Sequence, residues 1–170
     1  MFKQSNIDFQ SGSGSSSEIG FLKKINKKLI LNIDLSLDEY NGVSLYDGAV
    51  YKWSTKHIGI QDAIIYKIFR TGVFDFNAKI GIKASTVKYG KQEMDRVVYD
   101  LMGEKEFSGF VLVNLLAIQL KSNISKNSAI SLGYNYNTSF NLANTSEEKL
   151  SFNINQIQLG VFFLIKNNIL

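Results

Sequence analysis

The stretch LILNIDLSLD, residues Leu29–Asp38, decides the fold class of this chain. Every second residue from Leu29 to Leu37 is apolar, and the residues between them are Ile30 and the polar Asn32, Asp34 and Ser36, with Asp38 continuing the polar face. Side chains of an extended strand point to opposite faces in turn, so one face of this segment is apolar and the other is mostly polar. The stretch therefore predicts a β-strand with two unlike faces.

The same period of two recurs along the chain. It is clear in Val73–Ser85, in Ile130–Phe140 and from Ile157 to Ile165. Four further segments alternate less regularly: Ala49–Phe69, Phe107–Lys121, Ser17–Ile25 and Lys3–Gln10. With these segments the expected count is about eight strands.

One break in the alternation is expected near the end of the chain. Leu150, Phe152 and Ile154 have the opposite parity to Ile157 and the apolar residues after it. A β-bulge inserts one extra residue and so changes the parity. The slip at Asn155-Gln156 therefore predicts a bulge.

The links between these segments fall into two classes. Short polar turns are expected at Asn26-Lys27, Arg70–Gly72 and Asn123–Asn127. Longer links are expected at Ser11–Ser16, Asn41–Gly48, Lys88–Glu106 and Asn141–Lys149. The two classes alternate along the chain, which is typical of an up-and-down barrel with short turns at one end. Both termini should then lie at the short-turn end.

The link Lys88–Glu106 is expected to be the longest outer loop. Within it, Met94–Met102 has apolar residues at helical spacing, which would fit a short helix packed on the barrel rim. The link could instead contact a ligand or partner. Ser11–Ser16 is rich in Ser and Gly but lacks the lysine and helix of a phosphate-binding loop, so a flexible loop is expected there.

Composition excludes several classes of protein. The 170 residues contain no cysteine, which excludes disulfides and thiolate chemistry, and no proline, which suits a chain that is nearly all paired strand. The net charge is +4, but the lysines are scattered, so nucleic-acid binding is not expected. No run of about 18 apolar residues occurs, so no transmembrane helix is expected.

The two faces of the strands indicate a membrane barrel. A soluble barrel turns its apolar face inward and covers its outside with charge. Here the polar face carries Asn, Ser, Gly and Gln with matched Asp and Lys, while the apolar face has almost no charge and many aromatic rings. That division suits a polar interior and an outer surface in lipid. We therefore predict one domain over residues 1–170, an all-β, antiparallel up-and-down transmembrane β-barrel of about eight strands.

This polarity assigns individual residues to a side. The residues expected to face lipid are Leu31, Ile33, Leu35, Phe76, Ile80, Leu132, Leu159 and Val161. The residues expected to face the interior are Asn32, Asp34, Asn77, Lys79, Asn135 and Gln158. The aromatic residues expected near the membrane interface are Tyr40, Tyr51, Trp53, Phe69, Phe74, Tyr134, Tyr136, Phe140 and Phe152.

Such a barrel has to be exported, yet Met1–Ser5 turns polar at once and is no signal peptide. We therefore expect that a leader was removed or that an upstream segment is missing.

Three stretches resemble a known family. They are EIGFLKKINKKLILNIDLSLDEYNG from Glu18, HIGIQDAIIYKIFRTGVFDFNAKIGIKAS from His57, and LKSNISKNSAISLGYNYNTSFN from Leu120 followed by QIQLGVFFLIKN from Gln156. Together they resemble the porin-like outer-membrane β-barrel family of Bacteroidota that includes the PorT-type proteins. The resemblance implies insertion by the outer-membrane machinery, although the chain ends on Leu170 rather than on an aromatic residue. It carries no functional residue over.

The sequence offers little catalytic chemistry. His57 is the one histidine, so any histidine-based relay must use it; a place at a strand end near the membrane interface is the more ordinary expectation. Three aspartates and two lysines fall on the polar parity: Asp34, Asp38, Asp75, Lys79 and Lys83. We expect these charges to pair across the interior, because an unpaired buried charge is costly. No catalytic residue, metal site or cofactor is predicted.

The leading functional hypothesis is a non-enzymatic outer-membrane barrel, structural or accessory, in contact with outer-membrane lipid and with a possible protein partner in an envelope complex. Three alternatives stay open: a narrow transporter or ligand-binding barrel, a lipid-modifying outer-membrane enzyme using His57, and a soluble lipid-binding barrel.

Overall fold

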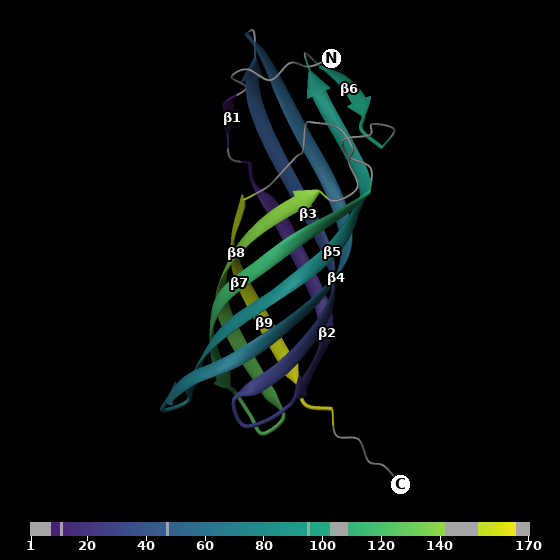
Figure 1. Cartoon of the computed structure of the whole chain (residues 1–170). Helices are drawn as coiled ribbons and strands as arrows, with labels where there is room; N and C mark the ends of the chain where they lie inside the picture. The colour runs from purple at the N-terminus through teal and green to yellow at the C-terminus, as the bar shows by residue number, and fades with distance from the viewer. Residues whose placement is uncertain are drawn as a thin grey trace.

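The computed structural model describes residues 8–10, 12–46, 48–94, 96–102, 109–141 and 153–165. Over these residues the chain forms one antiparallel sheet of nine strands and no helix (Figure 1). The strands are β1 (Asp8–Gln10), β2 (Gly14–Lys24), β3 (Leu29–Tyr46), β4 (Ala49–Thr71), β5 (Phe74–Met94), β6 (Val97–Asp100), β7 (Phe110–Asn123), β8 (Ser128–Asn141) and β9 (Asn153–Phe163). The predicted all-β, antiparallel class is confirmed.

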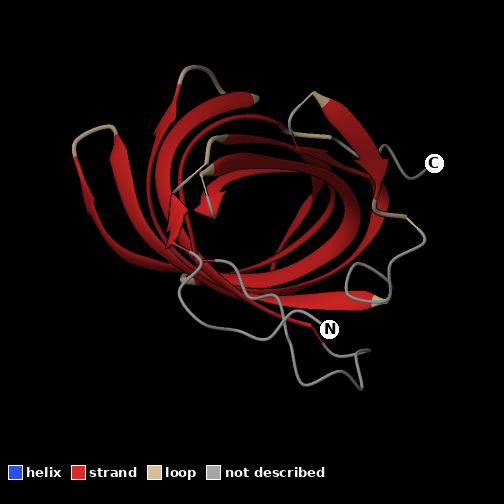
Figure 2. Ribbon diagram, turned by 90° about the horizontal axis from the view of Figure 1, so that it is seen from above, coloured by secondary structure: helices blue, strands red, loops and turns tan. Residues whose placement is uncertain are grey.

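Seven long strands form the wall, and they curl around a common axis (Figure 2). Their order across the sheet is β2, β3, β4, β5, β7, β8 and β9. The curl stops short of closure, because no backbone pairing joins the two edge strands β2 and β9 within the described residues. The sheet is thus an incomplete barrel, and the gap between β2 and β9 is called the seam below.

The three short turns all lie at one end of the barrel, the lower end in Figure 1. They link β2 to β3, β4 to β5 and β7 to β8, as predicted. In the first turn the amide of Asn26 donates to the carbonyl oxygen of Leu29, and in the second Gly72 has a φ of 55°. A positive φ is easily adopted by glycine, which has no Cβ.

The upper end differs from the expected long loops. Asn41–Tyr46 is strand rather than loop, because β3 and β4 stay paired as far as Tyr46 and Ala49. Lys88 to Met94 continues β5, and residues Lys91–Met94 pair with β6. The described residues of Met94–Met102 therefore form no helix. Helical spacing of apolar residues was misleading here because backbone pairing with a neighbouring strand overrides local propensity.

The first strands also differ from the expectation. Both β1 and β2 pair with β3, β1 opposite its upper part and β2 opposite its lower part. Asp8–Gln10 therefore adds no separate crossing of the wall, and the rest of the expected strand Lys3–Gln10 lies outside the described residues. Gly14 to Ser16 belong to a strand rather than to a flexible loop. Since β1 lies at the upper end and β9 finishes at the lower end, the two ends of the described chain lie at opposite ends of the barrel, not together.

The bulges occur elsewhere than predicted. The pairing of β9 with β8 is continuous from Asn153 to Phe163, so Asn155-Gln156 is not a bulge, and Ile154 shares the inward parity of Gln156. Register shifts occur instead in the pairing of β4 with β5, between Lys56 and His57 and between Lys67 and Phe69. Leu150, Phe152, Glu104, the rest of the Lys88–Glu106 link beyond Met102, and the Asn141–Lys149 link beyond Asn141 lie outside the described residues.

The predicted division of faces is confirmed across the wall. Inward residues such as Asn32, Asn77 and Asn135 are at most 5% exposed, whereas Leu35, Ile80 and Leu132 are 55%, 64% and 51% exposed. The exceptions are aromatic. Tyr40 lies inside against His57, and Tyr51 and Trp53 share the inward parity of Thr55, so these three rings are not on the outer face as expected.

Candidate functional site: the charged interior

The interior of the barrel gathers charged and amide side chains from β3, β4 and β5, which are adjacent in the sheet. Alternation sends every second residue of each strand inward, and the register sets which inward residues are level. Asp34 is level with Gln61 on β4, and Gln61 is level with Lys83 on β5. Asp34, Gln61 and Lys83 are all buried. The site is therefore a product of alternation and register together.

The strongest contact in the interior is an ion pair between Asp38 and Lys83. The Lys83 Nζ donates to Asp38 Oδ2 at 2.6 Å, and the two side chains are only 3% and 1% exposed. Ser16 from β2 donates to the other carboxylate oxygen at 2.6 Å, and Ser36 donates to Oδ2 at 3.0 Å. The carboxylate is thus satisfied by three donors, which offsets its loss of water.

A second cluster repeats this arrangement nearer the lower end. Lys79 Nζ lies 3.5 Å from Asp34 Oδ2 and 3.9 Å from Glu18 Oε2. Gln61 donates to Asp34 at 2.9 Å, and Asn32 donates to its other oxygen at 2.8 Å. This cluster links β2, β3, β4 and β5 through side chains alone.

Both lysines reach their aspartates across β4, and small residues on β4 leave room for them. Lys83 lies level with Gln61 but pairs with Asp38, which lies level with His57, so its side chain must pass the position of Gly59. A Cβ at Gly59 would meet the Cβ of Ser85 at 2.9 Å and the hydroxyl of Ser36 at 3.1 Å. On the same geometry, Lys79 passes Ala63 to reach Asp34. The two clusters therefore share a small residue on β4, Gly59 or Ala63, as well as an Asp–Lys contact.

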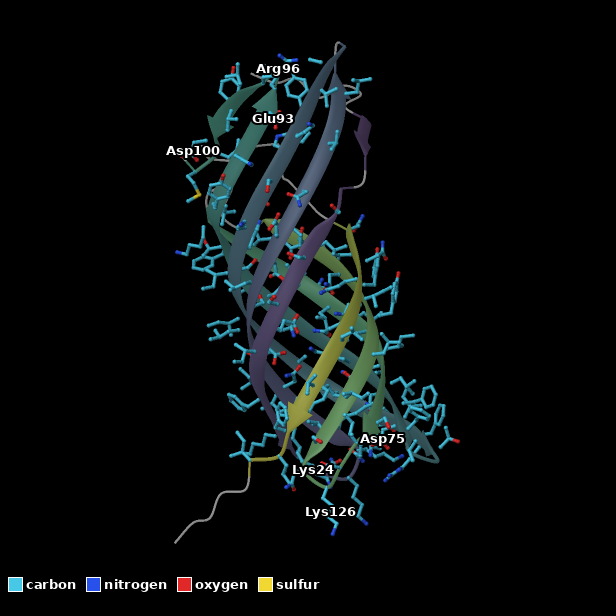
Figure 3. The ribbon with its side chains drawn as sticks, turned by 180° about the vertical axis from the view of Figure 1, so that it is seen from behind. Lys24, Asp75, Glu93, Arg96, Asp100 and Lys126 are labelled. Carbon is cyan, nitrogen blue, oxygen red and sulfur yellow. The ribbon has the colours of Figure 1, made fainter. Side chains whose placement is uncertain are left out.

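Asp75 forms a separate ion pair near the lower rim, where Figure 3 labels it. Its carboxylate lies 2.9 Å from Lys67 Nζ and 3.8 Å from Arg70 Nε. Its partners are therefore not Lys79 or Lys83. The predicted bridging of strands by Asp–Lys pairs is confirmed, but with β4 as the source of the lysine at this position.

His57 is buried in the inner wall, 3% exposed, rather than at a strand end facing the outside as expected. Its Nε2 lies 3.1 Å from the Thr55 hydroxyl, and its ring meets the edge of Tyr40 at 5.0 Å between centroids. Its Nδ1 has no hydrogen-bond partner among the described residues. The parity of β4 decides this placement, because His57 alternates with the outward residues Lys56 and Ile58.

The inner side of β7 is apolar over its upper part. The inward residues there are Val111, Val113, Leu115 and Ala117, all at most 7% exposed, whereas Gln119 below them is polar and contacts Asn77 and Ser131. β8 returns to polar inward residues, including Asn135 and Asn137. The interior ion pairs thus lie along β2–β5. Phe107–Lys121 looked apolar on both faces because the inward residues of β7 from Val111 to Ala117 are apolar.

The outer face is an apolar belt with few polar interruptions. Asp62 is exposed between Ile60 and Ile64 on β4, and its carboxylate forms no ion pair or hydrogen bond within the described part of the chain. The register places Asp62 and Asn114 on either side of Ile82. A groove of about 910 Å³ crosses the belt at this level, lined by Leu31, Ile33, Asp62, Ile80 and Leu116 among others.

Sequence reasoning found the aspartates and lysines of the interior but missed several of their partners. Glu18, Gln61, Ser16 and Lys67 were not singled out. Glu18 has the polar parity of β2, but the weak alternation of that strand hid it. Gln61 follows directly from the alternation of β4, so a reading of Ala49–Phe69 by parity would have found it.

No group of three or more His, Asp or Glu side chains that could hold a metal ion occurs among the described residues. No helix within the described ranges is long and apolar enough to cross a membrane.

Comparisons with protein families, with characterised proteins and with solved structures return no match to this chain.

Proposed function

We propose that this chain is a membrane-spanning β-barrel of a bacterial outer membrane, acting as a non-enzymatic structural or accessory component. The observation that carries the proposal is the inverted polarity of the wall. Ile60, Ile80 and Leu132 point outward and are 56%, 64% and 51% exposed, while Asp38 and Lys83 point inward and are buried. In water that arrangement would expose apolar surface and bury charge, both at a cost; in a bilayer the outer surface meets hydrocarbon.

The extent of the belt supports a bilayer. On β4 the outward residues from Ile58 to Ile68 are apolar or aromatic except for Asp62, and Lys56 stands directly above them. Eleven residues of tilted strand cover about 25–30 Å, which matches the hydrocarbon thickness. Lys56 lies 3.9 Å from Glu39, so a charged pair marks the upper edge of the belt. Figure 3 shows Lys24 and Lys126 at the lower end.

The paired interior supports a role without a wide pore. The Asp38–Lys83 pair and the Asp34–Lys79 contact connect β3 with β5 inside the barrel. Charges held in this way occupy space that a diffusing solute would need. A structural or accessory role, in contact with outer-membrane lipid and with a protein partner, fits this better than a narrow transporter does. Membership of the porin-like Bacteroidota family remains part of the proposal.

The direct test is whether the folded state needs an apolar environment. The purified chain is expected to stay monodisperse in detergent, to precipitate when detergent is removed, and to fold into lipid vesicles with protection of the belt from protease. A protein that stays monodisperse and folded without detergent would contradict the proposal and favour a soluble lipid-binding barrel.

The enzymatic alternative has its own test. His57→Ala leaves the membrane-embedded fold intact in a non-enzymatic barrel and abolishes activity in a lipid-modifying one. The variant should be assayed for acyl transfer and deacylation on outer-membrane lipid beside the unaltered chain. Activity that depends on His57 would replace the proposed role.

A further inference from the structure

We propose that the seam between β2 and β9 accepts one β-strand from a second polypeptide, running from the lower end to the upper end. The inference rests on the proposed membrane location and adds a kind of partner to it. It concerns the edges of two strands of 11 residues each, β2 and β9, which face each other and which no backbone pairing joins within the described residues.

The directions of the strands make the seam unsuited to direct closure. Seven long strands alternate in direction across the wall, so the first and the last run the same way. β2 runs down from Gly14, which is level with Tyr40, and β9 runs down from Asn153, which is level with Thr138. Every pairing in this sheet is antiparallel, and one strand running upward would be antiparallel to both edges.

The width of the seam fits one strand. The Cα atoms of β2 and β9 stay more than 8 Å apart along nearly all of their length. Directly paired strands lie about 4.8 Å apart, so two strands with one between them lie about 10 Å apart. Backbone N–H and C=O groups that face hydrocarbon without a hydrogen-bond partner are strongly unfavourable, and an inserted strand would pair them on both edges.

Side chains beneath the seam specify what the inserted strand can carry. Gln158 of β9 donates to Glu18 of β2 at 2.7 Å, and Glu18 also lies near Lys79. This contact crosses the inner side of the seam, so the inserted strand needs a small inward residue at that level. On the outer side Ile19 and Leu159 are 77% and 81% exposed, more than Ile60 at 56% in the middle of the wall. The strand therefore needs apolar residues facing outward.

Neither the described connections nor a second copy supplies this strand. Each connection between consecutive wall strands begins and ends at the same end of the barrel, so none makes a single crossing. Copies inserted in the same orientation present only downward-running edges to one another, which would pair in parallel. The occupant we infer is a strand of a different protein, added by backbone hydrogen bonding.

Cysteine pairs measure whether the seam is open. The chain has no cysteine, so introduced pairs report cleanly. Ile19→Cys with Leu159→Cys spans the seam, while two control pairs lie on partnered strands: Ile19→Cys with Leu35→Cys, and Leu132→Cys with Leu159→Cys. A disulfide requires Cα atoms within about 7 Å. The two control pairs should form disulfides directly on oxidation, whereas the seam pair should be joined only by a thiol cross-linking reagent about 10 Å long. A direct disulfide across the seam would overturn the proposal.

A peptide with the sequence of β8, residues Ser128–Asn141, probes strand acceptance. In its native register against β9 it places Gly133 opposite Gln158, where a small inward residue is needed. Carrying a quencher, it should saturably quench a fluorophore on the Ile19→Cys variant in vesicles. A Leu132→Pro peptide, which loses a backbone donor, and a Gly133→Phe peptide, which meets the Glu18 contact, should each bind at least about tenfold more weakly. Equal binding of the three peptides, or no binding, would overturn the proposal.

The two proposals fail in different ways. The control cysteine pairs form in any folded state, in detergent or without it. A chain that folds without detergent, with the seam pair still open, removes the membrane role and leaves the open seam. A chain that requires detergent but closes its seam keeps the membrane role and removes the inserted strand.

Discussion

The lower and upper halves of β4 differ in what their outward residues are, although both halves belong to one continuous strand. Below Lys56 the outward positions carry isoleucine at Ile58, Ile60, Ile64 and Ile68. Above it they carry lysine and serine as well, at Lys52 and Ser54. The inward positions change as well, since Tyr51 and Trp53 in the upper half are only partly buried whereas Gln61 in the lower half is fully buried.

This difference indicates the level along β4 at which the environment of the outer face changes. Backbone pairing continues through both halves, so strand formation does not need the apolar face. On β4 the outer face is nearly continuously apolar only in the lower half, where the wall also includes β7, β8 and β9 (Figure 1). On the proposed membrane location, the upper half of β3–β5 stands above the bilayer.

Removing one member of the buried ion pair should have the largest effect. Asp38→Ala leaves Lys83 buried and unpaired, and we expect it to destabilise the barrel by about 3–5 kcal/mol. Glu39→Ala breaks the exposed pair with Lys56 at the upper edge of the belt, with an expected cost of about 0–1 kcal/mol. Urea unfolding from lipid vesicles measures both. Similar losses for the two variants would mean that the interior is solvated.

A lysine placed on the outer face should distinguish the two halves of β4. Ile60→Lys lies at the middle of the belt and is expected to cost about 2–4 kcal/mol in vesicles, whereas Val50→Lys in the upper half should cost about 0–1 kcal/mol. Both residues are exposed, so a soluble protein would tolerate both changes equally. Matching free energies of folding for the two variants would argue against the membrane location.

The rim ion pair should matter less than the central one. Asp75→Ala removes the contact with Lys67, whose side chain is 30% exposed, so solvent reduces the cost to about 1–2 kcal/mol. In detergent the melting temperature of this variant should still be lower than that of Glu104→Ala, a substitution outside the described residues. The reverse order would show that the rim pair contributes nothing.

The smallest expected effect is an increase in the stability of the folded chain. Asp62→Leu replaces a carboxylate in the middle of the belt, and in vesicles it should stabilise the folded chain by about 1 kcal/mol, since a charge facing hydrocarbon is unfavourable. Lys56→Leu, on the same face at the charged edge, should give no such gain. A loss of stability on Asp62→Leu would indicate that Asp62 has a partner in the folded state.

Alternation along a strand is local, and so the sequence by itself determined the strands of the lower half and the direction of their side chains. Leu29–Asp38 and Ile130–Phe140 gave both faces correctly, because the period of two follows from backbone geometry alone. The same reasoning placed Asp34, Asp38, Lys79 and Lys83 inside. It failed in the upper half, where polar residues on the outer face remove the alternation. Asn41–Gly48 and Lys88–Met94 looked like loops for this reason.

Pairing between strands is not local, and only the tertiary structure decided it. Register placed Asp38 within reach of Lys83 across Gly59, put β1 in line with β2, and located the bulges beside Lys56 and Lys67. It also left β2 and β9 running in the same direction on either side of a seam. These features depend on which residues lie level on neighbouring strands, and a period of two within each strand carries no information about the neighbour.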